Sequence, residues 1–273
     1  MAQDISLSSS ARSILLSLTN TQSLVARTQN RLSNGLKVAS AIDDATSYFQ
    51  SKTLNDRASD FADKKSGIDQ AVSSLNAALE ATDAVDSLVR QLKGLAISAK
   101  TATGTELSDV VTQFNDLRGQ IDLLTGDASY QGLNLINGTG ETLTVSFSND
   151  TASILDIDSV DLTVGSLGLD ITSAASFSLT SNVEAAITEL DSAITTLRSQ
   201  GSTLGSNVSL LQTRLEFTQK YVNVLEGGAS KLTLADINEE GANLVALQTR
   251  QQLSISALAF AGQSEQSVLS LFR

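Results

Sequence analysis

The chain has 273 residues, a formal net charge of −12 and no His, Cys, Pro or Trp. His is the commonest general base and metal ligand, and Cys supplies thiolates, so their absence excludes Ser-His-Asp triads, H-E-x-x-H proteases, zinc-thiolate sites and most transition-metal enzymes. We expect no catalytic residue, no metal site and no cofactor. Sites built from carboxylates alone, such as Mg²⁺ or glycosidase sites, remain possible. The negative net charge argues against nucleic-acid binding.

The first residues lack the features of a secretory signal. Asp4 stands where such a signal needs basic residues, and no apolar stretch approaches the roughly 15–20 residues of a signal core or a membrane span. We therefore expect a soluble chain that, if it leaves the cell, does so without a cleaved signal peptide.

A first helix is predicted from residues spaced alternately by four and three, the spacing of a coiled coil. Asn34-Gly35 follows and is a favourable helix end, because Gly readily adopts a positive φ. Thr and Ala weaken the pattern, so this helix needs a partner. The spaced residues are Leu7, Ala11, Ile14, Leu18, Thr21, Val25, Thr28 and Leu32.

Two further helices carry the same spacing. The second changes phase once; the third is predicted to begin at a capping box, Thr103-x-x-Glu106, and to end near Gly126. Their apolar residues are Ile68, Val72, Leu75, Leu79, Val85, Leu88, Leu92 and Leu95 in the second helix, and Leu107, Val110, Phe114, Leu117, Ile121 and Leu124 in the third.

From about residue 127 the pattern becomes turn-rich and then strand-like. Alternation predicts one strand through Leu143, Val145 and Phe147, a turn at Asn149-Asp150, and another strand through Val160, Leu162 and Val164. No Lys or Arg occurs between Arg118 and Arg198, so this stretch carries nearly all the net charge and is best left in water. Its eleven acids are Asp122, Asp127, Glu141, Asp150, Asp156, Asp158, Asp161, Asp170, Glu184, Glu189 and Asp191.

The helical pattern then returns and is at its strongest. A capping box at Ser181-x-x-Glu184 opens a long helix that Gly227-Gly228 is expected to end, and a last helix follows Thr233 or Asp236. The long helix spaces Val183, Ile187, Leu190, Ile194, Leu197, Gly201, Leu204, Val208, Leu211, Leu215, Thr218, Val222 and Leu225 by three or four. The last helix carries Leu244, Leu247, Ile255, Leu258, Ala261, Val268 and Phe272, and several places of its series are polar, for example Gln251 and Ser254.

These patterns predict a mainly α fold: a long antiparallel coiled-coil helical bundle with a small β-hairpin region in the middle of the chain. Nothing in them indicates an enclosed pocket. The terminal helices are weakly apolar, so we expect them to pair with each other, with other copies, or with both.

Both ends of the chain resemble bacterial flagellins. Residues 31–45, RLSNGLKVASAIDDA, are similar to the family's N-terminal signature, and residues 257–271, ALAFAGQSEQSVLSL, are similar to its closing motif. The signature residues are Arg31, Leu32, Ser33, Gly35, Asp43 and Asp44. Gly35 is expected to supply a positive φ or to allow close packing of a neighbouring subunit. Asp43 and Asp44 are expected to cap the next helix, or to bridge to Arg31 or to another subunit.

The resemblance implies a structural, non-enzymatic subunit of the flagellar filament. Flagellins are exported unfolded through a narrow channel without a cleaved signal peptide, and polymerise at the distal tip of the flagellum. The implied partners are other flagellin subunits, hook-associated junction and cap proteins, the flagellar export apparatus and a flagellin chaperone, with no nucleic acid or membrane. Residues implied in coiled-coil assembly are Leu7, Ala11, Ile14, Leu18, Val25, Leu32, Leu244, Leu247, Ile255, Leu258, Ala261, Val268, Leu269 and Leu271.

The resemblance also divides the chain. Residues 1–40 with 232–273 are expected to form the inner coiled coil, 41–126 with 181–231 the surrounding helical bundle, and 127–180 an outward-facing β-rich segment. This segment is too short for the large outer domains of many flagellins. Its hydroxyl side chains are either glycosylated, as in some flagellins, or plain solvated surface; the candidates are Thr139, Thr142, Thr144, Ser146, Ser148, Thr151 and Ser153.

Three alternatives are weighed. A hook–filament junction protein has similar ends but does not form long filaments. A secreted hydrolase on a helical scaffold is disfavoured by the absence of His, and a membrane-surface protein by the scarcity of cations on the terminal helices. The family's pattern for recognition by an animal innate immune receptor is broken at Gln91 and Gly94, so the resemblance does not extend to that recognition.

Overall fold

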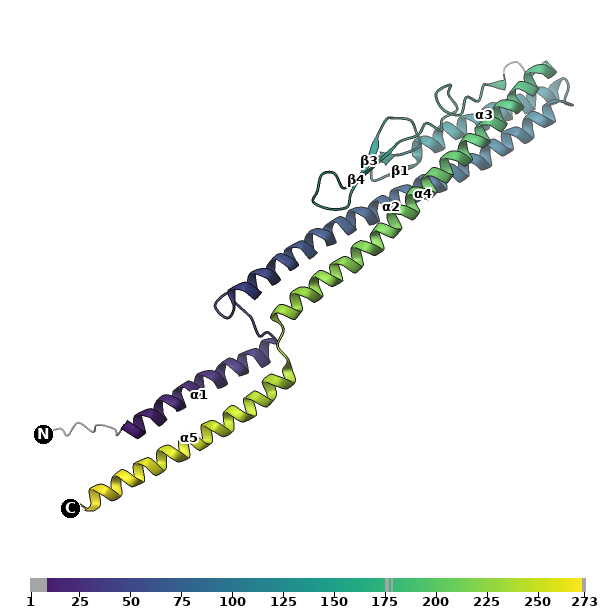
Figure 1. The fold of residues 1–273 in the computed structure, drawn as a ribbon. Helices are drawn as coiled ribbons and strands as arrows, with labels where there is room; N and C mark the ends of the chain where they lie inside the picture. The colour runs from purple at the N-terminus through teal and green to yellow at the C-terminus, as the bar shows by residue number, and fades with distance from the viewer. Residues whose placement is uncertain (1–8, 175–176, 178, 272–273) are drawn as a thin grey trace. The chain divides into compact units, whose positions relative to one another are not determined.

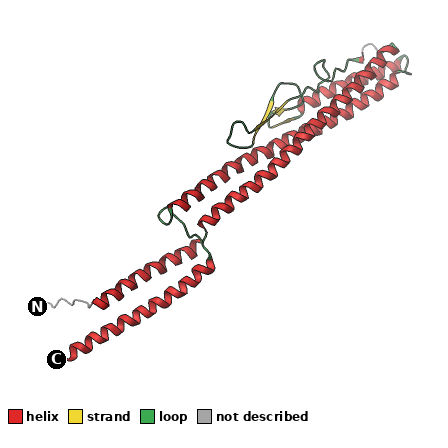
Figure 2. Ribbon diagram, viewed as in Figure 1, coloured by secondary structure: helices red, strands yellow, loops and turns green. Residues whose placement is uncertain are grey.

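The computed structural model describes residues 9–174, 177 and 179–271. These residues form five α-helices and two antiparallel strand pairs (Figure 1; Figure 2). The predicted fold class, mainly α with a small β-hairpin region in the middle of the chain, is confirmed. The elements are α1 (Ser9–Asn34), α2 (Ala45–Ala99), α3 (Thr105–Asp127), β1 (Ser129–Tyr130), β2 (Leu133–Asn134), β3 (Thr142–Ser146), β4 (Ile154–Asp158), α4 (Thr180–Thr233) and α5 (Ile237–Leu271).

The chain divides into two compact units, and each contains segments from both halves of the sequence. One unit comprises Met1–Asp56 with Leu225–Arg273, and the other comprises Arg57–Val224. The boundaries fall inside α2 and α4 rather than in loops. The three-part division expected from the sequence separates the β-rich segment as well, and it stays a prediction.

Helices α2 and α4 run antiparallel through the unit Arg57–Val224. Phe61, early in α2, meets Tyr221, late in α4, with ring centroids 4.9 Å apart. Lys100, directly after α2, pairs with Glu184 near the start of α4 at 3.4 Å. The predicted series in α4 is buried or half-buried at each position from Val183 to Val222, so the coiled-coil spacing correctly predicts the packed face.

The core of this unit also includes α3 and the segment that follows it. Phe114 of α3 packs edge-to-face on Phe177, with ring centroids 5.1 Å apart. The largest fully buried side chains are Phe114, Ile68, Leu75, Leu92, Ile121, Ile136, Leu162, Ile171, Leu190, Leu197, Leu204 and Leu211. The irregular segment around residues 160–177 therefore contributes to the core as the helices do.

A row of polar side chains on α3 holds this irregular segment in place. Asn115 Oδ1 accepts a hydrogen bond from the Ala174 backbone N–H at 3.0 Å, and Asp122 Oδ1 accepts one from the Val164 N–H at 2.9 Å. Arg118 Nε donates to the Ile171 carbonyl at 2.6 Å. The three side chains are spaced by three and four residues, so they share one face of α3. They satisfy backbone groups that no strand ladder reaches.

The strand expected through Leu143, Val145 and Phe147 is confirmed as β3, but the second predicted strand is wrong. The partner of β3 is β4, with Leu143 opposite Ile157 and Val145 opposite Leu155.

Residues 160–164 form no named strand, although Leu162 and Val164 are buried. The Val160 and Leu162 N–H groups donate to the Leu135 and Ile136 carbonyls at 2.8 and 2.9 Å. Asp161 Oδ1 then accepts from the Thr163 N–H at 2.9 Å, a local turn that competes with continued strand pairing.

Three predicted helix ends are also wrong. Helix α3 begins after Gly104, which has φ 61° and makes no side-chain cap, so Thr103 is not the capping residue. Helix α4 begins at Thr180, which places Ser181 inside the helix. It also runs through Gly227-Gly228 to Thr233, because the buried neighbours Leu225 and Ala229 keep this turn packed and outweigh the low helix propensity of Gly.

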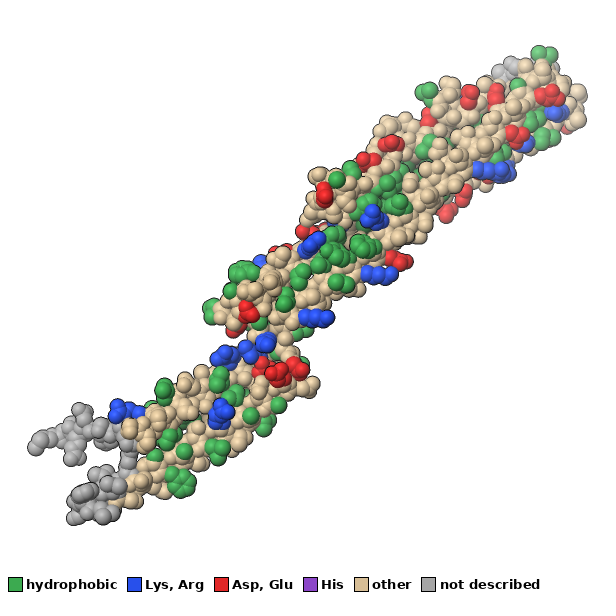
Figure 3. All heavy atoms as spheres, viewed as in Figure 1, with side chains coloured by type: hydrophobic (Ala, Val, Ile, Leu, Met, Phe, Trp, Pro, Cys, Tyr) green, Lys and Arg blue, Asp and Glu red, His purple; other side chains and the backbone are tan. Residues whose placement is uncertain are grey.

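The acidic stretch faces solvent, as its charge predicts. Of the eleven acids between Arg118 and Arg198, all of which the structure describes, nine are exposed, and Asp161 and Glu189 are half-buried. On the face drawn in Figure 3, acidic side chains are visible at the surface of the β-rich segment. A solvated acidic surface needs no bound cation to balance it.

Gly168 should be the least replaceable glycine of the β-rich segment. A Cβ built there would lie 2.3 Å from the Thr163 carbonyl oxygen, a distance that only backbone movement relieves. We expect Gly168→Ala to lower the free energy of unfolding by about 1–3 kcal/mol in urea titrations. Gly165→Ala is the matched control, since its nearest neighbour is at 3.7 Å. Equal stability of the two variants would contradict the close approach.

Candidate assembly site

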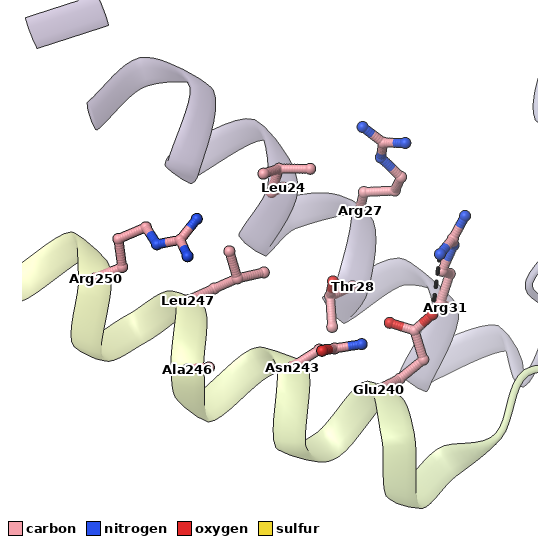
Figure 4. Close-up of a pocket in the computed structure, with 9 residues that line it drawn as sticks. All are labelled: Leu24, Arg27, Thr28, Arg31, Glu240, Asn243, Ala246, Leu247 and Arg250. Carbon is pink, nitrogen blue, oxygen red and sulfur yellow. Dashed lines mark hydrogen bonds and ion pairs between the residues drawn. The ribbon is translucent and has the colours of Figure 1, made fainter. Parts of the chain in front are cut away.

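Helices α1 and α5 pair antiparallel within the unit Met1–Asp56 with Leu225–Arg273. Arg31, near the end of α1, forms an ion pair with Glu240, near the start of α5, with Nη1 and Oε1 2.9 Å apart. Leu24 and Leu247 face each other further along (Figure 4). Glu240 is only 7% exposed, so Arg31 supplies the cation that a buried carboxylate requires.

The predicted assembly residues fall into three groups. Ala11 is buried, and Ile14, Leu18, Val25, Leu32, Leu244, Leu247, Leu258 and Ala261 are half-buried along the α1–α5 pair. Ile255 is 51% exposed, and Ser254 takes the half-buried place beside it. Leu7 lies outside the described residues, as do the side chains of Val268, Leu269 and Leu271.

Sequence reasoning missed Glu240 as part of the packed face of α5. The half-buried positions Leu244, Leu247, Gln251, Ser254, Leu258 and Ala261 continue at the same spacing from Glu240. Extending the series four residues back from Leu244 would have found it. A charged residue at a coiled-coil position reads as a break in the pattern until its partner, here Arg31, is known.

Helix α5 has a second row of exposed residues. Val245, Leu253 and Phe260 are 63, 65 and 72% exposed, and apolar side chains that are exposed together on one face mark a candidate contact surface. With the exposed Ala242, Thr249 and Ser256 they follow spacings of three and four, so they lie on the side of α5 away from the face packed on α1. Between Gly241 and Ser264 the only charged residue is Arg250. Figure 3 shows hydrophobic side chains at the surface of this part of the chain.

The opposite face of α1 is polar. It carries exposed Arg12, Leu16, Ser23 and Arg27 at helical spacing, and only Leu16 among these is apolar. An amphipathic helix of this kind has its apolar residues covered once one face is packed, whereas α5 leaves a second row of apolar residues exposed when one of its faces is packed on α1. The two paired helices therefore differ in what they leave exposed.

A shallow groove of about 330 Å³ lies along the α1–α5 pair (Figure 4). Arg27, Arg31 and Arg250 line it together with Glu240, so its charge is positive on balance. Because three cations line the groove beside one carboxylate, it favours an anionic group over a cationic one.

The two linkers beside this pair are joined through their backbones. Gly35 has φ 68°, the positive value expected after a helix, and its carbonyl accepts a hydrogen bond from the Ala235 N–H at 3.0 Å. The Lys37 N–H donates to the Thr233 carbonyl at 2.7 Å, beside an antiparallel bridge between Leu36 and Leu234. The signature glycine thus turns the chain where both linkers meet.

Asp44 caps helix α2. Its Oδ1 accepts hydrogen bonds from the backbone N–H groups of Thr46 at 3.0 Å and Ser47 at 3.2 Å, and its Oδ2 accepts one from the Ser47 hydroxyl at 2.7 Å. The bond from the Ser47 hydroxyl, then those from the backbone, hold the pKa of Asp44 below its usual value. The capping role expected for Asp44 is the one observed.

Asp43 closes the linker instead of capping a helix. Its Oδ2 accepts from the backbone N–H groups of Ala39 and Ser40, both at 3.1 Å. The Ser40 backbone bond is the main cause that lowers the pKa of Asp43, and the Arg31 charge is a minor one. The ion-pair partner of Arg31 is Glu240, not an aspartate of the signature.

Most hydroxyl candidates for glycosylation already make hydrogen bonds. Thr142 and Thr144 donate across the hairpin to Asp158 and Asp156 at 2.8 and 2.6 Å, and Thr139 donates to Asn137 at 2.8 Å. Ser146 donates to the Ser148 carbonyl at 2.9 Å, and the Ser148 hydroxyl accepts from the Asp150 N–H at 3.1 Å. For Thr151, which is exposed, and Ser153, which is half-buried, no hydroxyl bond is present within the described residues.

Within the described residues, no cluster of three or more His, Cys, Asp or Glu is placed to hold a metal ion. In the same part of the chain, no helix is long and apolar enough to cross a membrane.

Comparisons with known proteins agree on one family. The model of the bacterial flagellin N-terminal helical region matches residues 5–141, and that of the C-terminal helical region matches residues 187–272. Flagellin FljM of Caulobacter vibrioides is 32% identical over 98% of both chains, and a flagellin of Brucella melitensis is 31% identical over 97% of both. A solved structure from Vibrio parahaemolyticus, assigned to a flagellar hook-associated protein, has a TM-score of 0.61. It covers 70% of this chain and 100% of its own, and at 13% identity this likeness shows the fold alone.

The Asp44 cap predicts a pH dependence of stability. Because the folded-state pKa is lowered, the cap stabilises the fold above the unfolded-state pKa of about 3.9 and loses this effect as pH falls through the folded value. We expect Asp44→Asn, which retains a capping oxygen without the charge, to melt below wild type near pH ~7 and to converge with it in acid. Circular dichroism melts over this range measure the difference.

The exposed Asp63, further along α2, provides the matched control. Asp63→Asn should stay parallel to wild type across the pH range. An Asp44→Asn deficit that persists unchanged in acid would show that the cap does not act through its charge.

Proposed function

This chain belongs to the bacterial flagellin family, and we propose that its terminal helices α1 and α5 join it to other subunits in the filament. Family membership makes it a structural subunit of the extracellular flagellar filament, a polymer of flagellin, and not an enzyme. The proposal concerns the surface that makes the polymer and the way in which subunits arrive there.

The exposed row on α5 is the single observation that carries the proposal. One face of α5 packs on α1, and the opposite face presents Val245, Leu253 and Phe260 to solvent. Covering such a row removes apolar surface from water at a gain of roughly 25 cal/mol per Å². A neighbouring subunit is the partner that a polymer-forming family supplies, and contacts between unlike surfaces extend a chain of copies rather than closing a dimer.

Weak pairing of the two ends couples folding to assembly. Several inward positions of the pair are small or polar: Ala11, Thr21, Thr28, Gln251 and Ser254. An isolated pair of this composition is marginal, so a neighbour that covers the outer row of α5 also stabilises the pair. The predicted residues between α1 and α5 then hold the pair together, and Ile255, which is 51% exposed, lies at the edge of the packed face.

Export as an unfolded chain and polymerisation at the distal tip complete the proposal. A chain without Cys forms no disulfide, and one without Pro has no slow X-Pro isomerisation after it emerges. The proposed partners on this route are the export apparatus, a flagellin chaperone, the cap and the hook-associated junction proteins. The proposed route uses no cleaved signal peptide, as the resemblance to flagellins implies.

The acidic middle of the chain is proposed to face outward from the filament. Its exposed carboxylates are accommodated at no cost in water but would repel one another between subunits. If this surface is glycosylated, Thr151 is the favoured acceptor, because it is exposed and its hydroxyl is not engaged within the described residues.

A hook–filament junction protein is not favoured. Both matching family models are those of flagellins, as are the Caulobacter and Brucella relatives that span nearly the whole chain. The likeness to the Vibrio structure concerns the fold.

Removal of the ends should abolish filament formation. Limited trypsin digestion of the monomer is expected to cut at Arg12, Arg27, Arg31 or Arg250 and to leave a folded helical core, because the packed α2–α4 region protects its own sites. Electron microscopy after seeding should show long filaments from intact protein and none from the trimmed core. Normal polymerisation of the core would refute assembly through the ends, and an intact chain that forms no long filaments would favour the junction protein.

Loss of one apolar side chain from the outer row should weaken assembly without unfolding the subunit. Burial of a Phe side chain contributes about 1.5–3 kcal/mol, so Phe260→Ser should raise the critical concentration for polymerisation about tenfold or more. Leu16→Ser is the matched control: Leu16 is 64% exposed, but on the polar face of α1. Sedimentation of seeded reactions measures both, and equal effects would mean that the row on α5 is not selective.

A further inference from the structure

The dipeptide Asn-Gly occurs twice in the sequence, at Asn34-Gly35 and at Asn137-Gly138. In this dipeptide the glycine nitrogen can attack the side-chain amide of the preceding residue, because glycine has no Cβ to hinder the approach. The surroundings of the pair then decide whether the attack takes place in the folded protein. The two pairs have opposite surroundings here.

Asn34 is open to this reaction. It is exposed at the last residue of α1, where helices fray most readily. Among the described residues, no hydrogen bond engages its side-chain amide. A Cβ built at Gly35 would meet no heavy atom within 4 Å, so no neighbouring side chain crowds this turn.

Asn137 is held in place. Its Oδ1 accepts hydrogen bonds from the Thr139 N–H at 3.2 Å and the Thr139 hydroxyl at 2.8 Å. The Gly138 N–H, the group that would attack, donates to the Val160 carbonyl at 3.1 Å. A Cβ at Gly138 would lie 2.6 Å from the Asp161 Cγ, so the side chain of Asp161 crowds this turn. Reaction there requires local opening of the β-rich segment.

We propose that Asn34 is a site of spontaneous deamidation in the folded subunit. The Gly35 nitrogen loses its proton to water or hydroxide and bonds to Asn34 Cγ. The bond from Cγ to Nδ2 breaks, and Nδ2 takes up a proton and leaves as ammonia, which yields a succinimide ring. Water then opens the ring at either carbonyl, giving aspartate or isoaspartate at position 34. The reaction needs only water and involves no change of oxidation state.

Either product disturbs the junction of the two linkers. A new carboxylate at the C-terminus of α1 is disfavoured by the helix dipole. Isoaspartate in addition inserts a methylene group into the main chain directly before Gly35. This alters the path of the backbone that bonds Gly35 to Ala235 and Lys37 to Thr233. Deamidated subunits accumulate with time, and in them α1 is held less firmly at the junction of the two linkers.

Peptide mass spectrometry of the full chain tests the site. The protein is incubated at mildly alkaline pH, folded in buffer or unfolded in urea, and sampled over the time in which the unfolded chain converts half of its Asn34. Trypsin releases Asn34 in the peptide 32–37. Since no tryptic site lies between Arg118 and Arg198, a digest at glutamates is used to obtain Asn137 in the peptide 107–141, whose fragment ions distinguish it from Asn115 and Asn134.

In the folded protein we expect Asn34 to convert at least about tenfold faster than Asn137, with separate aspartate and isoaspartate peaks, and in urea we expect similar rates at both. Asn34→Gln should abolish the mass shift in peptide 32–37 and confirm its position. Folded protein in which Asn34 stays intact, or in which Asn137 converts as fast, would overturn the proposal. Its outcome does not depend on whether the protein forms filaments.

Discussion

Antiparallel pairing of segments from opposite ends of the sequence is the constraint on which this structure depends. In one unit α1 meets α5, and in the other α2 meets α4, so the chain must run out and return. The turn-rich middle is the part that this pairing leaves free to vary. It carries the acids that self-assembling helices must avoid, because like charges between close-packed copies would oppose the apolar contacts that bind them.

The sequence predicts helices well where one apolar face is clear. In α4 the series from Val183 to Val222 is buried or half-buried throughout, because a long helix with a single apolar stripe has one way to pack. Helix α5 is apolar on two faces, and the pattern cannot say which face meets α1. The predicted series of α5 includes both Ser254, which is half-buried, and its neighbour Ile255, which is 51% exposed.

Polar contacts between distant segments could not be predicted. Asn115, Arg118 and Asp122 read as ordinary solvent-facing residues of α3, yet they bind the backbone of residues 164–174. Arg31 and Glu240 are likewise 209 positions apart. A short-range signal was available for β4, where Leu155 and Ile157 alternate with Asp156 and Asp158, and the stronger apolar run at 160–164 obscured it. Burial alone therefore does not identify a strand.

The junction between the two linkers has a consequence for where the protein works. It is made by main-chain groups, with Lys37 bonded to Thr233 and Ala235 to Gly35. Mobile ions largely screen the attraction between exposed charges that lie more than about 8 Å apart at physiological ionic strength, but they leave neutral amide–carbonyl bonds nearly unaffected. A filament outside the cell meets water whose salinity the bacterium does not control. A link of this kind holds at low and at high salt concentration. Because it uses main-chain groups, the side chains around it can be substituted in evolution without breaking it.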